Sequence, residues 1–129
     1  MIHIVDTHSL IWFLGNDKRL GPNARLVFEA PSPYLVIPTI VMAEIKYLSD
    51  RRRVPLTFDE VARKIRTALQ GHMATLDEEI VEKTSTTLEM HDGIICATAV
   101  VYANRLNDSA AVITRDEAIT ASGLVQVVW

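Results

Sequence analysis

Short apolar runs of strand type alternate with longer segments of helical pattern along almost the whole chain. Four such runs lie at residues 2–5, 34–37, 110–113 and 125–129, with a weaker one at 73–76. Helical patterns cover residues 7–14, 22–28, 40–49, 58–70, 77–88 and 91–106, with a short one after residue 116. Parallel strands need crossovers of this length, so the alternation predicts an α/β fold with a mostly parallel central sheet and helices on both faces.

The composition points to one folded domain. Of the 129 residues, 49% are hydrophobic, which excludes a disordered chain. No apolar run reaches the ~20 residues of a membrane span, and the N-terminus lacks the basic start of a signal peptide. The single cysteine, Cys96, cannot form an internal disulfide and lies in an apolar helical pattern. We therefore expect one cytoplasmic domain over residues 1–129, without a membrane partner.

Three aspartates stand at the amino ends of predicted helices. Asp6 and Asp116 each follow a buried strand, and Asp92 begins the long helix. Because the carboxyl ends of parallel strands meet at one edge of a sheet, Asp6 and Asp116 are expected to converge there. The simpler interpretation is that each aspartate is an N-cap, whose carboxylate accepts a backbone N–H.

Glu44 lies within an apolar stripe of the 40–49 helix, formed by Ile40, Val41, Tyr47 and Leu48. A buried carboxylate is unfavourable unless it is paired or bound to a metal. One interpretation places Glu44 at the edge of the stripe, in reach of water and a basic neighbour. In the other, Glu44 joins the aspartates, because its helix begins at the same sheet edge.

A cluster of four carboxylates would need a cation to hold it together. Oxygen ligands without cysteine or histidine suit Mg²⁺ or Mn²⁺ rather than zinc. The four histidines show no ligand spacing and are interpreted as structural or surface residues.

Positive charge is concentrated in one segment, although the chain carries a net charge of −3. Residues 45–72, called the basic segment below, hold seven basic and three acidic side chains, a net charge of +4. The basic residues are Lys46, Arg51, Arg52, Arg53, Arg63, Lys64 and Arg66. Such a run is often only a solvated face; the alternative is a surface that holds the phosphates of a polyanion.

Four short motifs, in this order, resemble those of the PIN-domain endoribonucleases, in particular the VapC-type toxins of toxin–antitoxin pairs. They are Asp6-Thr7-His8 followed by Leu10-Ile11-Trp12, then Ala43-Glu44-Ile45, the run from His91-Asp92-Gly93 to Ala99, and Thr114-Arg115-Asp116. The resemblance covers essentially the whole chain. It implies a PIN-like three-layer α/β/α sandwich over residues 1–129.

By position, the resemblance makes Asp6, Glu44, Asp92 and Asp116 the catalytic and metal-binding acids. They would hold one or two Mg²⁺ or Mn²⁺ ions, and Thr114 would orient them. The implied function is a metal-dependent endoribonuclease that leaves a 5′-phosphate and a 3′-hydroxyl. The implied partners are RNA, a second copy in a homodimer, and an antitoxin whose tail fills the acidic groove.

The resemblance also bears on substrate contacts. The basic segment, together with Arg115, would hold the RNA backbone. Thr39 stands where relatives often have serine, and Gly93 where many have arginine or another residue. These departures concern substrate contacts and leave the acids intact.

Other classes also place acids at strand ends. A receiver-type phosphoacceptor has paired acids after its first strand and a lysine after its last, whereas Asp6 stands alone and no lysine follows Lys83. A haloacid-dehalogenase-like phosphatase has a second aspartate two residues after the first, where this chain has His8. The non-enzyme alternative, a catalytically weak PIN-like RNA-binding module, predicts that an acid is lost, and all four are present.

Overall fold

Five parallel strands form one central sheet in the computed structural model, which describes residues 1–129. The strands are β1 (Ile2–Val5), β2 (Tyr34–Pro38), β3 (His72–Ala74), β4 (Ala110–Ile113) and β5 (Gln126–Val128). Their order is β3-β2-β1-β4-β5, and every neighbouring pair is parallel. The predicted parallel sheet is confirmed, with no antiparallel strand.

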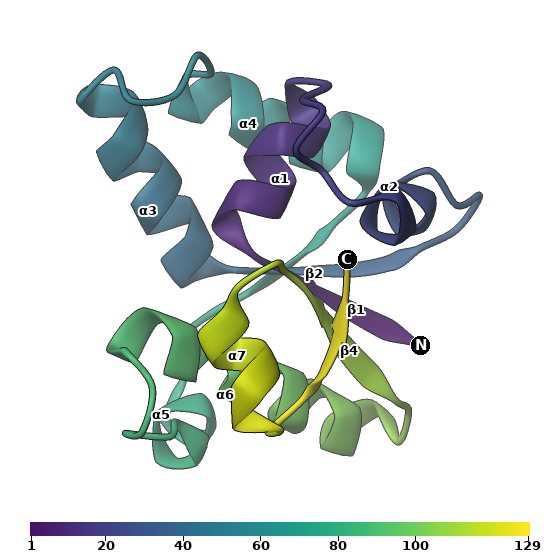
Figure 1. Cartoon of the computed structure of the whole chain (residues 1–129), viewed down its shortest axis with the longest axis vertical. Helices are drawn as coiled ribbons and strands as arrows, with labels where there is room; N and C mark the ends of the chain where they lie inside the picture. The colour runs from purple at the N-terminus through teal and green to yellow at the C-terminus, as the bar shows by residue number, and fades with distance from the viewer.

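Helices cover both faces of this sheet (Figure 1). One layer holds α1 (Thr7–Leu14), α2 (Pro22–Phe28), α3 (Thr39–Asp50) and α4 (Phe58–Lys64), which continues into the π-helix η1 (Ile65–Leu69). The opposite layer holds α5 (Glu78–Lys83), α6 (Met90–Leu106) and α7 (Glu117–Ser122). The two layers follow from right-handed crossovers, because the chain moves from β1 to β3 in one direction and from β3 to β5 in the other.

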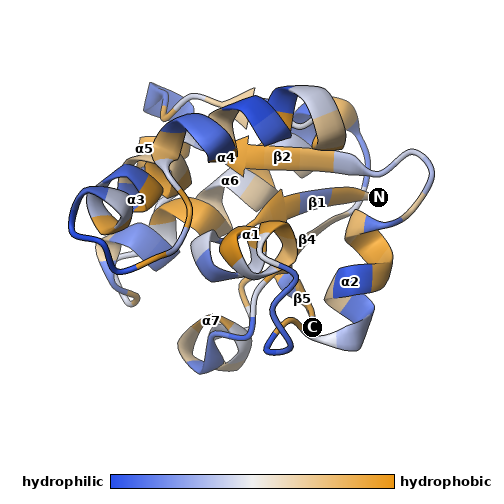
Figure 2. Cartoon of the chain, turned by 90° about the horizontal axis from the view of Figure 1, so that it is seen from above, coloured by the Kyte–Doolittle hydropathy of each residue, from blue (hydrophilic) through white to orange (hydrophobic).

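Both faces of the inner strands are buried, which explains their continuous apolar runs. Figure 2 shows hydrophobic residues along β1 and β2 in the middle of the fold. The main core contains 23 buried residues, and a smaller cluster joins α5 to α6 through Ile80, Ile94, Ala97 and Val101. None of the helices combines the length and the apolar character that crossing a bilayer requires.

Two sequence predictions about helices are wrong in detail. The helix expected over 77–88 ends at Lys83, because Thr84 adopts an extended backbone and its hydroxyl donates to the carbonyl of Ile80. On α3 the buried residues are Val41, Met42 and Ile45, whereas Tyr47 is 50% exposed. The apolar stripe on α3 is therefore narrower than its periodicity suggested.

The strand order creates a switch point between β1 and β4. The chain leaves β1 into α1 on one face of the sheet and leaves β4 into α7 on the other. The backbone N–H of Asp6 donates to the carbonyl of Ile113, which joins the ends of the two strands. Ligands of open α/β sheets bind in the crevice outside such a pair of strand ends.

Candidate active site

A buried hydroxyl links the two aspartates at the switch point. Thr114 Oγ1 donates to Asp6 Oδ2 over 2.5 Å and accepts from the backbone N–H of Asp116 over 3.0 Å. Thr114 is only 1% exposed, so it has no access to water as an alternative partner. The hydroxyl therefore sets the position of Asp6 relative to Asp116.

The same two aspartates are also helix caps. Asp6 Oδ1 accepts from the N–H of Thr7 at the start of α1, and Asp116 Oδ1 accepts from the N–H of Ile119 in α7. The N-cap interpretation is thus confirmed for both, and in each case it occupies only one carboxylate oxygen. Asp92 is not a cap: it lies in the first turn of α6, and Glu89 stands at the N-cap position without a side-chain bond.

Glu44 lies at the edge of the buried stripe of α3, with 30% of its side chain exposed. Thr7 Oγ1 donates to Glu44 Oε2 over 2.8 Å, and His91 Nε2 lies 2.5 Å from the same oxygen. His91 Nδ1 in turn lies 3.6 Å from Asp92 Oδ1. The interpretation of Glu44 as an edge residue with a basic neighbour fits this geometry, and the neighbour is a histidine.

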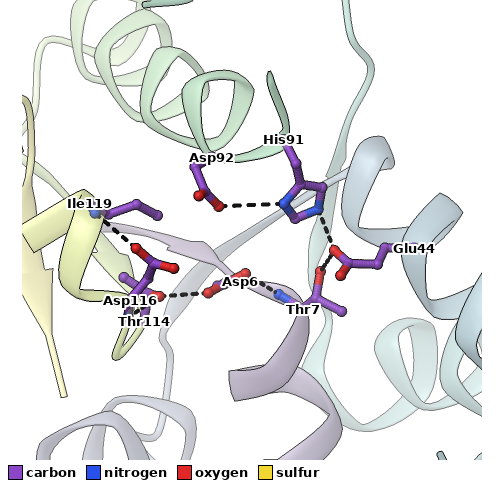
Figure 3. Close-up of polar contacts among 8 residues, drawn as sticks. All are labelled: Asp6, Thr7, Glu44, His91, Asp92, Thr114, Asp116 and Ile119. Atoms are coloured by element: carbon purple, nitrogen blue, oxygen red, sulfur yellow. Dashed lines mark hydrogen bonds and ion pairs between the residues drawn. The ribbon is translucent and has the colours of Figure 1, made fainter. Parts of the chain in front are cut away.

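Figure 3 shows these contacts as one series that crosses the carboxyl edge of the sheet. It runs from Asp116 through Thr114 and Asp6 to Thr7, and from Thr7 through Glu44 and His91 to Asp92. We call this series the acidic network. All four acids singled out in the sequence belong to it, although they come from four different segments of the chain.

Thr7 received no role from the sequence, and His91 was interpreted there as a structural or surface residue. A search for metal-ligand spacing could not find it, because its partners in the structure are the carboxylates of Glu44 and Asp92. The available signal was its position beside Asp92 in the first turn of a helix, which places both side chains at the same end of the sheet.

The electrostatics of the network follow from burial and crowding. Burial raises the pKa of Asp6, more than its bonds from Thr114 and Thr7 lower it. Burial also raises the pKa of Asp92, and the nearby charge of Asp116 adds to the effect. The contact between Glu44 and His91 lowers the pKa of the carboxyl and raises the pKa of the imidazole, so it favours the charged pair.

Cys96, which is buried in α6, is affected by the same cluster of negative charges. Burial raises the pKa of its thiol to about 11, with further contributions from Asp92, Asp116 and Asp6. The thiol is therefore protonated at neutral pH, and Cys96 is a buried core residue, which fits its place in an apolar helical pattern.

The donor chemistry of the network suits a hard divalent cation. Its acids offer only oxygen, and a cation would relieve the repulsion that Asp92 experiences from Asp116 and Asp6. In this conformation no three acidic, histidine or cysteine side chains converge closely enough to coordinate one ion. A Mg²⁺ ion held by one or two of these carboxylates would complete its coordination with water.

A cleft of about 780 Å³ opens beside Asp6 and Asp116. Its other lining residues are His8, Ser9, Trp12, Arg19, Thr114, Arg115, Glu117, Ala118 and Trp129. None of the basic side chains of the basic segment lines this cleft. The arginines that line the cleft, Arg19 and Arg115, lie outside the basic segment.

Fold and site together define an α/β domain that gathers carboxylates at the switch point of a parallel sheet. The family model of the PIN domain matches residues 3–122. The chain therefore belongs to the PIN domain family, whose members include nucleases that generally use divalent metals.

Similar solved structures support the same fold. A toxin–antitoxin complex from Klebsiella pneumoniae matches with a TM-score of 0.66 and 24% identity, over 98% of this chain and 96% of that one. VapBC2 from Rickettsia felis, bound to a DNA fragment from its promoter, matches with a TM-score of 0.66 and 14% identity, over 98% of this chain and 97% of that one. VapBC-1 from nontypeable Haemophilus influenzae matches with a TM-score of 0.63 and 19% identity, over 98% of this chain and 96% of that one. Among proteins with curated descriptions, none matches the chain.

The two departures from the family pattern have local packing roles. Thr39 Oγ1 accepts from the N–H of Leu76 and ties the start of α3 to the segment after β3. A Cβ on Gly93 would lie 2.6 Å from the carbonyl oxygen of Ser85, so no side chain fits there. Glycine at 93 thus allows the 84–89 segment to approach α6 closely.

Proposed function

We propose that this protein is an endoribonuclease that depends on Mg²⁺ or Mn²⁺, and that it acts as the toxin of a toxin–antitoxin pair. The observation that carries the proposal is the acidic network at the switch point, in a chain of the PIN family. Asp6, Glu44, Asp92 and Asp116 are the proposed metal-binding and catalytic acids.

The role of each residue follows from its contacts. A bound divalent cation would supply an activated water and neutralise charge on the scissile phosphate. Thr114 would hold Asp6 and Asp116 in register, and Thr7 and His91 would orient Glu44. The cleft beside Asp6 would admit the RNA strand, which would be cut to a 5′-phosphate and a 3′-hydroxyl.

The proposed partners are an antitoxin protein and a second copy of the chain, with the activity located in the cytoplasm. Support for the antitoxin comes from the similar structures, because the Klebsiella pneumoniae protein was solved as a toxin–antitoxin complex. An antitoxin would have to cover or fill a cleft that Asp6, Asp116 and Glu117 line.

Cleavage of single-stranded or looped RNA with Mg²⁺, with Mn²⁺ and with EDTA tests the proposal. We expect EDTA to abolish cleavage, and Asp92→Asn to reduce it at least ~100-fold, as for loss of a group that stabilises charge in a transition state. Asp59→Asn is the matched control, because Asp59 is exposed in the first turn of α4, away from the network. Equal cleavage with and without chelator would falsify the proposal, and metal-insensitive binding without cleavage would favour the RNA-binding module.

A further inference from the structure

The cleft beside the acids contains an aromatic and cationic cluster built on Trp12. The guanidinium carbons of Arg19 and Arg115 lie 4.9 and 4.8 Å from the centre of the Trp12 ring. Trp129 packs its ring edge-on against Trp12, and His8 lies at 5.5 Å. Trp12 is only 6% exposed, so these neighbours cover it and it acts as their common support.

The two guanidinium groups differ in their other partners. Arg19 is held by Asp17, through Nε to Oδ1 at 3.1 Å and Nη2 to Oδ2 at 2.8 Å. Arg115 is exposed, and its guanidinium has only the Trp12 ring as a partner, although three acids line the same cleft. Its planar set of N–H donors is therefore available to a ligand.

The position of Arg115 limits what that ligand can be. It lies between Thr114 and Asp116, directly beside the acidic network. The Arg115 guanidinium lies over the Trp12 ring, and its planar set of N–H donors can make two parallel hydrogen bonds to phosphate oxygens. The basic segment does not reach this cleft, so it cannot hold a phosphate here.

We propose that Arg115, assisted by Arg19, binds the RNA phosphate next to the scissile one, and that Trp12 fixes both guanidinium groups for this purpose. This inference rests on the proposed function, because it assumes that RNA occupies the cleft. It assigns the backbone contacts nearest the acids to the cleft arginines instead of the basic segment. The alternative is that both arginines only cover Trp12.

Binding of a labelled single-stranded RNA of about ten nucleotides, measured by anisotropy between about 50 and 200 mM salt with Mg²⁺, separates these roles. Every variant is made in the Asp92→Asn background, where we expect cleavage to be at least ~100-fold slower. There, we expect Arg115→Gln to weaken binding roughly 5–10-fold and to reduce the slope of log affinity against log salt by about 0.7, the value for one phosphate contact on a single strand. Arg19→Gln should weaken binding less, because Asp17 already engages that side chain.

Lys18→Gln is the matched control, since it removes one positive charge from the loop that holds Arg19, and Lys18 does not line the cleft. Thermal melting of each variant checks that the fold is intact. Both tryptophans of the chain line the cleft, so RNA should also change their fluorescence in the background protein.

The inference would be overturned if Arg115→Gln and Arg19→Gln both bound RNA with the affinity and salt dependence of Lys18→Gln. Metal-dependent cleavage by the wild-type protein would then still support the proposed function. A wild-type protein that neither binds nor cleaves RNA would overturn both.

Discussion

Replacing Thr114 with valine removes one hydroxyl from the centre of the acidic network and keeps the shape of the side chain. The hydroxyl donates to the Asp6 carboxylate and accepts from the Asp116 N–H, and neither bond has a nearby replacement at a residue that is 1% exposed. A bond to a charged group contributes about 1.5–3 kcal/mol, and an unpaired N–H costs about 1 kcal/mol more. We expect Thr114→Val to lower the free energy of unfolding by about 2.5–4 kcal/mol.

Thermal melting with EDTA measures this loss. For 129 residues the expected shift is about 4 °C per kcal/mol, so the melting temperature should fall by roughly 10–16 °C. Thr98→Val is the matched control: Thr98 is equally buried, but its hydroxyl only donates to the Ile94 carbonyl within α6. That variant should lose less than ~1 kcal/mol, and Thr114→Ser should retain most of the wild-type stability.

The pH dependence gives a second test of the same reasoning. The bond from Thr114 stabilises the ionised form of Asp6, whose pKa is nevertheless raised above its ordinary value by burial. The difference between wild type and Thr114→Val should therefore be largest at neutral pH. It should shrink as the pH falls through the raised pKa of Asp6, because a protonated carboxyl needs the donor less. A Thr114→Val protein that melts like Thr98→Val, or a difference independent of pH, would refute this account.

Two further predictions concern His91 and Gly21. The contact with Glu44 raises the pKa of His91, so the stability it contributes is present below its ordinary pKa and is lost as the pH rises through the raised value. His91→Gln should therefore lower the free energy of unfolding by up to about 2 kcal/mol at mildly acid pH and by progressively less in alkali. Urea titrations with EDTA measure this, and a difference between wild type and variant that does not change with pH would contradict it. A Cβ on Gly21 would lie 2.5 Å from the backbone of Trp129, so Gly21→Ala should lower stability by about 1–3 kcal/mol and alter tryptophan emission. The backbone of Gly21 has a φ of −63°, which alanine adopts readily, so without that collision Gly21→Ala would be neutral or stabilising. An unchanged melting temperature would therefore show that the collision does not occur.

The features predicted from sequence were those that depend on local pattern and topology. Apolar runs at 2–5 and 110–113 read as strands, and a parallel sheet brings their ends together, so the approach of Asp6 to Asp116 followed without coordinates. The N-cap and site interpretations of these aspartates seemed to compete. In the structure one oxygen of each carboxylate serves as the cap, while the second oxygen of Asp6 accepts from Thr114 and the second oxygen of Asp116 has no hydrogen-bond partner.

The features missed depend on how separate elements pack. His91 and Glu44 are 47 positions apart, and their contact requires α3 and α6 to meet beyond the sheet edge, which periodicity within either helix cannot show. Tyr47 has helical spacing with the apolar stripe, but it is exposed and Arg51 covers its ring at 3.6 Å. Arg19 lies in a loop, and its place over Trp12 depends on how that loop folds back onto α1.

The two ends of the chain lie in very different surroundings. Met1 lies at the amino edge of the sheet, where its ammonium group pairs with Asp108, whereas Trp129 packs against Trp12 in the wall of the cleft. An affinity tag or fluorescent protein joined after Trp129 would begin inside that wall, next to Gly21. Fusion at Met1 would replace only an exposed ion pair and would leave the cleft open, so amino-terminal labels are the ones compatible with measuring what enters it.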